Sequence, residues 1–170
     1  MKKITLLLAV IGMISLNSCT INEHSGPDRD TISKVWEYTN VNFLPNSYSV
    51  VLNFPQTIPS SDMVLVYRLS GDFQGEDIWK LLPESYFFDD GTLDFRFVND
   101  FTRYNAQIDL EGFNLNGLNA SVRLNQVLRV VVVPGYFNNK MSKNMDFNNY
   151  KATLQAFNID DSKIQRIELK

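Results

Sequence analysis

An alternation of apolar and polar residues with a period of two runs through most of this chain from Val35 onward. Successive side chains of a β-strand point to opposite faces of a sheet, so this period gives each strand one apolar and one polar face. Residues 47–54, 92–97 and 106–110 follow it. Their apolar positions on one face are Tyr48, Val50, Leu52 and Phe54, then Leu93, Phe95 and Phe97, then Ala106, Ile108 and Leu110. We expect three strands that are half-buried.

Two other segments, residues 62–69 and 128–133, are apolar on both faces. A strand of this kind is typical of the middle of a sheet that is covered on both sides. The second segment is rich in β-branched residues and is stopped by Pro134 and Gly135, which favours a central strand over a helix. We therefore place both segments in the core.

A hairpin is predicted where Asp89, Asp90 and Gly91 separate the aromatic residues 86–88 from the strand that begins at Thr92. Asp-Gly pairs tolerate the positive φ angles of tight hairpin turns. The two flanking strands are therefore expected to pair antiparallel.

Near the end of the chain the period changes to that of a helix. Apolar residues three or four apart indicate a short amphipathic helix, and they are Phe147, Tyr150, Leu154 and Phe157. Asp146 precedes them and is predicted to cap the helix. Residues 164–169 then read as a final strand with Ile167 and Leu169 pointing inward.

Together these elements predict a mainly β fold, an antiparallel β-sandwich that is Ig-like in general architecture, with seven to nine strands and one short C-terminal helix. We expect that helix to cover a sheet edge or an open end of the sandwich. Trp36 and Trp79 are expected to anchor the core. The chain divides into a signal peptide (1–18), a flexible tether (19–33) and a single domain (34–170), long enough for a core of its own.

The first nineteen residues resemble the signal of bacterial lipoproteins. Lys2 and Lys3 precede an apolar run that is short for a membrane span, and the motif Leu16, Asn17, Ser18 and Cys19 follows. The resemblance implies cleavage before Cys19 and attachment of lipid to its side chain and new amino terminus. Several acyl chains anchor a protein stably, whereas one does so marginally. The alternative is an ordinary secretory signal whose cleavage happens to leave a cysteine.

The tether, residues 19–33, is poor in apolar residues and contains turn formers, which favours flexibility. Asp30, Thr31 and Ile32 match a short O-glycosylation pattern of envelope proteins, and chance explains such a match equally well. Thr20, where an aspartate retains some lipoproteins at the inner membrane, favours the outer membrane. Whether the domain faces the periplasm or the outside stays open.

Charge and cysteine content restrict the possible partners. Loss of Lys2 and Lys3 changes the formal net charge from −3 to −5. A net negative charge does not favour binding to the phosphates of nucleic acid. With Cys19 as the only cysteine, no disulfide can form within the chain.

Common catalytic arrangements lack their residues. The only histidine, His24, lies in the tether, so neither a Ser-His-Asp triad nor a zinc site of His and Cys is available to the domain. Two adjacent pairs of carboxylates, Asp89 with Asp90 and Glu76 with Asp77, are best explained by turn and surface roles. We expect no enzyme activity, no metal and no cofactor.

Aromatic residues leave binding open. Neighbours in a strand face opposite ways, so one of Phe87 and Phe88 should be exposed, and the same holds for Tyr136 and Phe137. Phe88, Tyr136 and Phe137 are the candidate ligand-facing aromatics, although most aromatic residues should be core. Three arginines are expected to pair with acids across strands, namely Arg68, Arg96 and Arg103.

Several segments together resemble a family of Bacteroidota lipoproteins without an established activity. They cover nearly all of the domain and are residues 35–37, 62–69, 77–83, 91–95, 100–102 and 128–135. Some members carry a collagen-like segment, of which only Gly26-Pro27 could be a remnant here. Some are labelled automatically as dihydrolipoamide dehydrogenase. That activity needs G-x-G-x-x-G turns and a redox-active cysteine pair, and this chain has neither.

These observations predict a lipid-anchored envelope protein with a non-catalytic β-sandwich that serves as an interaction or structural module. Its partners would be the membrane, through Cys19, and an envelope protein or glycan. The alternative is a surface lipoprotein that binds glycans or peptides. That alternative predicts exposed aromatic residues away from the tether.

Overall fold

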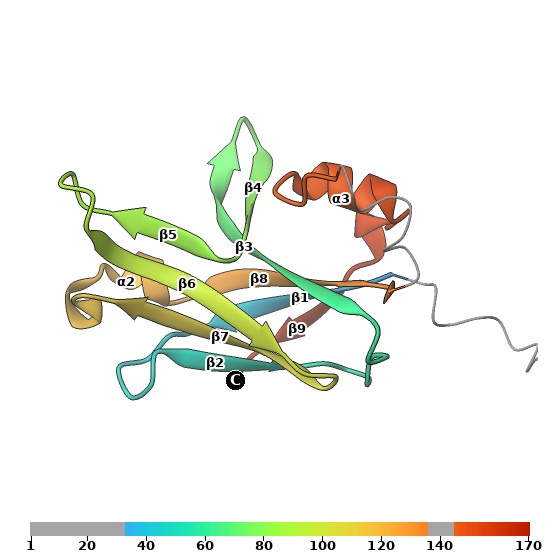
Figure 1. Ribbon diagram of the computed structural model, residues 1–170, viewed down its shortest axis with the longest axis horizontal. Coiled ribbons are helices and arrows are strands. Elements are labelled where there is room, and N and C mark those ends of the chain that lie inside the picture. The colour runs from blue at the N-terminus through green and yellow to red at the C-terminus, as the bar shows by residue number, and fades with distance from the viewer. Residues whose placement is uncertain (1–32, 136–144) are drawn as a thin grey trace, which may run out of the picture.

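Two β-sheets pack face to face in the computed structural model, which describes residues 33–135 and 145–170 (Figure 1). Sheet A has five strands in the spatial order β4 (Glu76–Leu81), β3 (Met63–Phe73), β8 (Gln126–Val133), β1 (Lys34–Val41) and β9 (Gln165–Glu168). Sheet B has four, in the order β2 (Ser49–Asn53), β7 (Asn105–Gly112), β6 (Leu93–Phe101) and β5 (Glu84–Phe87). The predicted mainly β sandwich is confirmed.

Strand β8 is the middle strand of sheet A, as its sequence predicts. It pairs antiparallel with β3 on one side and β1 on the other, so that Val131 lies opposite both Leu65 and Val35. Leu128, Val130 and Val132 face sheet B, whereas Val131 and Val133 face the opposite side. Burial of both faces explains why this segment is apolar throughout.

The predicted hairpin between β5 and β6 is also confirmed. In its turn, the Phe88 amide donates to the Thr92 carbonyl and the Gly91 amide donates to the Phe88 carbonyl, each over 2.9 Å. Gly91 has a φ of +83°, a conformation that favours glycine. Asp90 Oδ1 accepts hydrogen bonds from the amide and hydroxyl of Thr92, so this carboxylate has the turn role expected for it.

The main core lies between the two sheets. Trp36 is 3% exposed there, and its ring stacks on Phe54 with a centroid distance of 5.1 Å. Phe97 and Phe43 meet edge to face at 5.4 Å. Trp36 is therefore the core anchor that the sequence indicates.

A second apolar cluster covers the outer face of sheet A, where helix α3 (Tyr150–Ala156) packs. The expectation that the helix covers an edge or an open end is wrong. The reason is that the outer face carries apolar side chains which must be covered, namely Val35, Leu65, Tyr67, Val131 and Val133. Figure 1 shows α3 beside the raised β3–β4 hairpin.

The cap of α3 is Asn149, not Asp146. Asn149 Oδ1 accepts from the Ala152 amide at 3.0 Å. Asp146 lies three residues earlier, where its Oδ1 accepts from the Asn148 amide at 3.0 Å and shapes the preceding turn. The described residues contain three other short helical segments, which are η2 (Leu115–Gly117), α2 (Ala120–Arg123) and η5 (Asp161–Lys163).

The last strand, β9, is parallel to β1, and every other strand pair in the described residues is antiparallel. Ile167 of this strand and Leu169, which follows its last residue, pack on the main core, as predicted. None of the helices within residues 33–135 and 145–170 has the length and apolar character that a membrane crossing requires.

The sandwich has two distinct ends. Strand β1 starts at Lys34 beside the β6–β7 turn, where Arg103 donates to the Ile58 carbonyl, and we call this the tether end. Helix α2, which precedes β8, and the β5–β6 turn lie at the opposite end (Figure 1), called the far end.

Candidate functional site

Two buried arginines project from neighbouring strands of sheet A onto opposite faces. Arg68 on β3 lies opposite Leu128, and Arg129 on β8 lies opposite Tyr67. The two arginines are 7% and 8% exposed. A buried guanidinium requires partners, because loss of hydration is costly. Each arginine is accordingly the centre of a polar cluster.

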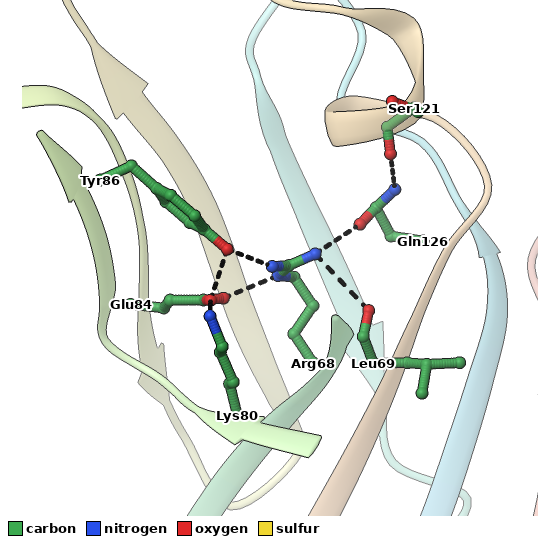
Figure 2. A network of polar contacts seen from close by, with 7 residues as sticks. All are labelled: Arg68, Leu69, Lys80, Glu84, Tyr86, Ser121 and Gln126. Carbon is green, nitrogen blue, oxygen red and sulfur yellow. Dashed lines mark hydrogen bonds and ion pairs between the residues drawn. The ribbon is translucent and has the colours of Figure 1, made fainter. Parts of the chain in front are cut away.

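The cluster around Arg68 lies between the sheets, and we call it the inner cluster (Figure 2). Arg68 donates from Nε to Glu84 Oε2 at 2.8 Å, from Nη2 to the Tyr86 hydroxyl at 2.7 Å and from Nη1 to Gln126 Oε1 at 3.1 Å. Tyr86 in turn donates to Glu84 Oε1 at 2.5 Å, and Lys80 Nζ lies 3.0 Å from the same oxygen.

The side-chain amide of Gln126, at the border of the inner cluster, also has hydrogen-bond partners. Gln126 Nε2 donates to the carbonyls of Ser121 and Leu124, both at 2.8 Å. Burial alone would raise the pKa of Glu84, but hydrogen bonds from Arg68, Tyr86 and Lys80 outweigh it and keep the pKa below its ordinary value. The cluster therefore joins sheet A, sheet B and α2, and its role is structural.

The cluster around Arg129 lies on the outer face of sheet A, and we call it the outer cluster. Arg129 Nε and Nη2 each lie 2.8 Å from Glu37 Oε2, and Nη1 donates to the Tyr150 hydroxyl at 2.8 Å. Its guanidinium stands over the Trp79 ring, 4.1 Å from the ring centroid. Arg166 Nε binds the other oxygen of Glu37 at 2.9 Å.

The outer cluster borders a cleft of about 210 Å³ between the β3–β4 hairpin and α3. A β-bulge between Leu69 and Gly71 accompanies the raised hairpin in Figure 1. The cleft is lined by Gly75, Glu76, Asp77, Trp79, Arg129, Tyr150, Lys151 and Asp161. This is the candidate functional site, because it combines an aromatic ring with several polar groups in a concavity.

Trp79 is half-buried and is not the core anchor predicted from the sequence. It lies on β4, an edge strand of sheet A, and packs against Tyr150 at a centroid distance of 5.5 Å. The cleft leaves part of the indole in solvent. The sequence predicted a core position for Trp79 because it does not show that β4 is an edge strand of sheet A.

The acidic residues of the cleft differ in their partners. Glu76 Oε2 pairs with Lys151 Nζ at 2.6 Å, which links the hairpin to α3. The carboxylates of Asp77 and Asp161 make no hydrogen bond or ion pair with another described residue, although the charge of Asp161 acts on Lys151 and Tyr150. In the same part of the chain, no group of three or more His, Cys, Asp or Glu residues converges to hold a metal ion.

Of the predicted ligand-facing aromatics, Phe88 is 45% exposed, at the far end. Phe87 is also exposed, by 62%, so the prediction that these two neighbours face opposite environments is wrong. Strand β5 ends at Phe87, and a register shift after Tyr86 interrupts the alternation. Tyr136 and Phe137 lie outside the described residues, as do His24 and the lipidation motif Leu16, Asn17, Ser18 and Cys19.

Phe113 is a further exposed aromatic that the sequence did not single out. It is 85% exposed and its amide donates to the Asp94 carbonyl, which places it near the start of β6 and so at the far end. The chain can approach Asp94 this closely because residue 112 is a glycine. A Cβ at Gly112 would lie only 2.5 Å from the Asp94 carbonyl oxygen. At the tether end, Phe101 and Tyr104 are exposed by 43% and 60%.

The three arginines that were expected to pair with acids across strands have different partners. Arg96 pairs with Glu111 across β6 and β7 at 2.7 Å, as expected. Arg68 also pairs with an acid, but Glu84 belongs to the other sheet. The prediction for Arg103 is wrong, since its Nε donates to a backbone carbonyl, that of Ile58.

The outer cluster was missed by reasoning from sequence, although a signal exists. Arg129 interrupts an apolar run, and Glu37 stands between apolar neighbours in β1. Charged residues in segments of this kind indicate a buried ion pair. The hairpin and α3, which complete the cleft, carry no such signal.

Comparisons of the chain with protein-family models, with curated proteins and with solved structures yield no match. The features of the chain that bear on its function are the sequence motif at Cys19, the exposed aromatic residues and the cleft beside Trp79.

Proposed function

We propose that this protein is a lipid-anchored component of a bacterial cell envelope, related to Bacteroidota lipoproteins and located at the outer membrane. Its β-sandwich would serve as a non-catalytic interaction or structural module. The motif from Leu16 to Cys19 supports the anchor, because it resembles the cleavage and lipidation site of lipoproteins. Several acyl chains on Cys19 would hold the domain at the membrane stably.

The observation that carries the interaction role is the exposure of large apolar side chains at the far end. Phe87, Phe88 and Phe113 are exposed by 62%, 45% and 85%. Exposed aromatics are frequent anchors of protein interfaces, because they bury much apolar area on binding. A domain held at Lys34 by its tether would present this end to a partner.

A non-catalytic role is supported by what the acidic residues do. Glu37 and Glu84 neutralise buried arginines, and Asp90 shapes a turn. Glu76 is paired with Lys151. These carboxylates have structural partners that account for their positions.

A second candidate is a lipoprotein that captures a glycan or peptide. The cleft beside Trp79 favours it, because a half-exposed indole lies next to polar side chains in a concavity. Such a protein would bind its ligand between the β3–β4 hairpin and α3. Its function would not require a partner at the far end.

The anchor is tested by replacing Cys19 with serine and separating detergent and aqueous phases. The proposal expects the wild-type chain in the detergent phase and Cys19→Ser in the aqueous phase. Retention of Cys19→Ser in the detergent phase would contradict lipid anchoring. Protease treatment of intact cells, with a periplasmic marker as control, then determines whether the domain faces outward.

The interaction role is tested by photo-crosslinking in living cells. A photoreactive phenylalanine analogue is placed at position 88, and position 101 is the matched control because Phe101 is exposed to a similar extent, 43% against 45%. The proposal expects a discrete crosslinked product from position 88 and a weaker one, or none, from position 101. Equal crosslinking at both positions, or none at position 88, would contradict contact through the far end.

A further inference from the structure

We propose that the cleft beside Trp79 binds one neutral sugar residue of a glycan. The ring of the sugar would contact the indole of Trp79, and its hydroxyls would bind Asp77, Asp161 and Arg129. This inference rests on the second candidate function above and specifies the ligand class of that site. It follows from the rigidity, hydrogen-bonding capacity, charge and size of the cleft.

The aromatic wall of the cleft is held in place before any ligand arrives. The guanidinium of Arg129 lies 4.1 Å from the Trp79 ring centroid, and Tyr150 lies 5.5 Å from it. Glu37 fixes Arg129 through two contacts of 2.8 Å. A preorganised ring loses little conformational freedom on binding, which favours affinity.

Both donors and acceptors remain for a ligand. Arg129 has five N–H hydrogens, and its contacts with Glu37 and Tyr150 account for three of them among the described residues. The carboxylates of Asp77 and Asp161 accept no hydrogen bond from that part of the chain, although the charge of Asp161 attracts Lys151. A hydroxyl group both donates and accepts, so a polyhydroxylated ring can use both kinds of group at once.

The charges around the cleft disfavour ionic ligands of either sign. Glu37 is shared by Arg129 and Arg166, and Glu76 pairs with Lys151. Together with Asp77 and Asp161, these groups carry four negative and three positive charges, and the small negative excess disfavours a phosphate or carboxylate. An ammonium group would meet these carboxylates favourably. At the Trp79 ring, however, it would lie near the guanidinium that already stands over that ring at 4.1 Å, and like charges repel. A neutral ligand avoids both costs.

The size of the cleft limits the ligand to a single residue. Its volume of about 210 Å³ lies below the range of about 300–1,000 Å³ that is usual for drug-sized ligands. A terminal sugar or one unit of a longer chain fits this limit. The rest of an oligosaccharide would extend into solvent.

The site is tested by NMR on the full-length chain, labelled with ¹⁵N and kept in a detergent without a sugar headgroup. The chain has two tryptophans, so Trp36 in the core is an internal control for Trp79. Methyl glycosides of glucose, galactose, mannose and N-acetylglucosamine are titrated one at a time, and Nα-acetyl-lysine methylamide, which keeps its ε-ammonium group, is the cationic probe.

We expect at least one glycoside to shift the Trp79 indole signal in a saturable manner without shifting that of Trp36. Asp77→Asn should weaken binding about tenfold, since it replaces a charged acceptor by a neutral one. Asp100→Asn, an exposed position on β6 of sheet B, is the matched control and should leave binding unchanged.

Three results would overturn the inference: no glycoside shifts Trp79, the lysine derivative binds at least as tightly, or both asparagine variants weaken binding equally. Neither the detergent partition of Cys19→Ser nor crosslinking from position 88 depends on this cleft. Failure of the sugar site can therefore be distinguished from failure of the proposed anchor and interaction role.

Discussion

The inner and outer clusters are built from the same kinds of residue and differ in what surrounds them. Each has a buried arginine paired with a buried glutamate, a tyrosine hydroxyl and an aromatic ring next to the guanidinium. The inner cluster lies between two sheets and engages the end of α2 through Gln126. The outer cluster has α3 on one side and an open cleft on the other.

The difference arises from the alternation of side chains along β3 and β8. Arg68 and Arg129 sit on adjacent strands, one register position apart, and therefore point to opposite faces of sheet A. The inner face is covered by a second sheet, whereas the outer face is covered in part by a helix of seven residues. A similar ion pair thus lies in a closed core in one environment and borders an open cleft in the other.

Arg68→Met should have the largest effect on stability. The substitution keeps apolar bulk but leaves Glu84 buried, with only the half-exposed Lys80 as a cationic partner. Breaking a buried ion pair in this way typically costs about 3–5 kcal/mol. Urea unfolding of the variant and the wild type measures the free energy of unfolding. A loss below about 1 kcal/mol would show that the inner cluster is not a structural tie.

Arg129→Met should be destabilising to a smaller extent. Glu37 retains Arg166 at 2.9 Å, and the cleft admits water to this side of the sheet. We expect a loss of about 1–3 kcal/mol in the same unfolding experiment. A loss equal to that of Arg68→Met would contradict the difference between the clusters. The double variant Arg129→Met with Arg166→Met should approach that larger value.

Acidification should weaken the inner cluster through Glu84. The pKa of this carboxyl is lowered in the folded protein from its ordinary value of 4.5, so its contribution to stability is present above pH 4.5 and is lost as the pH falls below that value. We expect the unfolding free energy of Glu84→Gln to fall less steeply over this range than that of the wild type. Parallel pH profiles of the two proteins would contradict this assignment.

Lys151→Ala should have the smallest effect. Lys151 and Glu76 are 73% and 69% exposed, and ion pairs between exposed side chains contribute little because solvent screens them. The midpoint of urea unfolding should therefore change little. A loss comparable to that of Arg129→Met would mean that this pair, rather than the outer cluster, holds the hairpin against α3.

Local patterns in the sequence predicted much of the sandwich. The period of two located β2, β6 and β7, and apolar runs on both faces located β3 and β8. The Asp-Gly turn predicted the β5–β6 hairpin. These features were predictable because alternation and turn chemistry act between residues that are near one another in the chain.

Features that depend on distant segments were not predictable in the same way. The parallel pairing of β9 with β1 joins residues about 130 positions apart, and Arg68 finds Glu84 on the opposite sheet. The cleft is formed by three separate parts of the chain, around Trp79, Arg129 and Tyr150. The alternation also failed at Phe87, where the strand ends. No local pattern specifies which faces meet or where an edge is left uncovered.

The two regions differ most in the exposure of their tryptophans, since Trp79 lies beside the open cleft and Trp36 in the closed core. Quenching of tryptophan fluorescence by acrylamide measures this difference, with Trp79→Phe and Trp36→Phe used to isolate the two residues. We expect strong quenching when Trp79 is the remaining tryptophan and weak quenching when Trp36 remains, because Trp36 is 3% exposed. Equal protection of both tryptophans, in variants that unfold as cooperatively as the wild type, would contradict it.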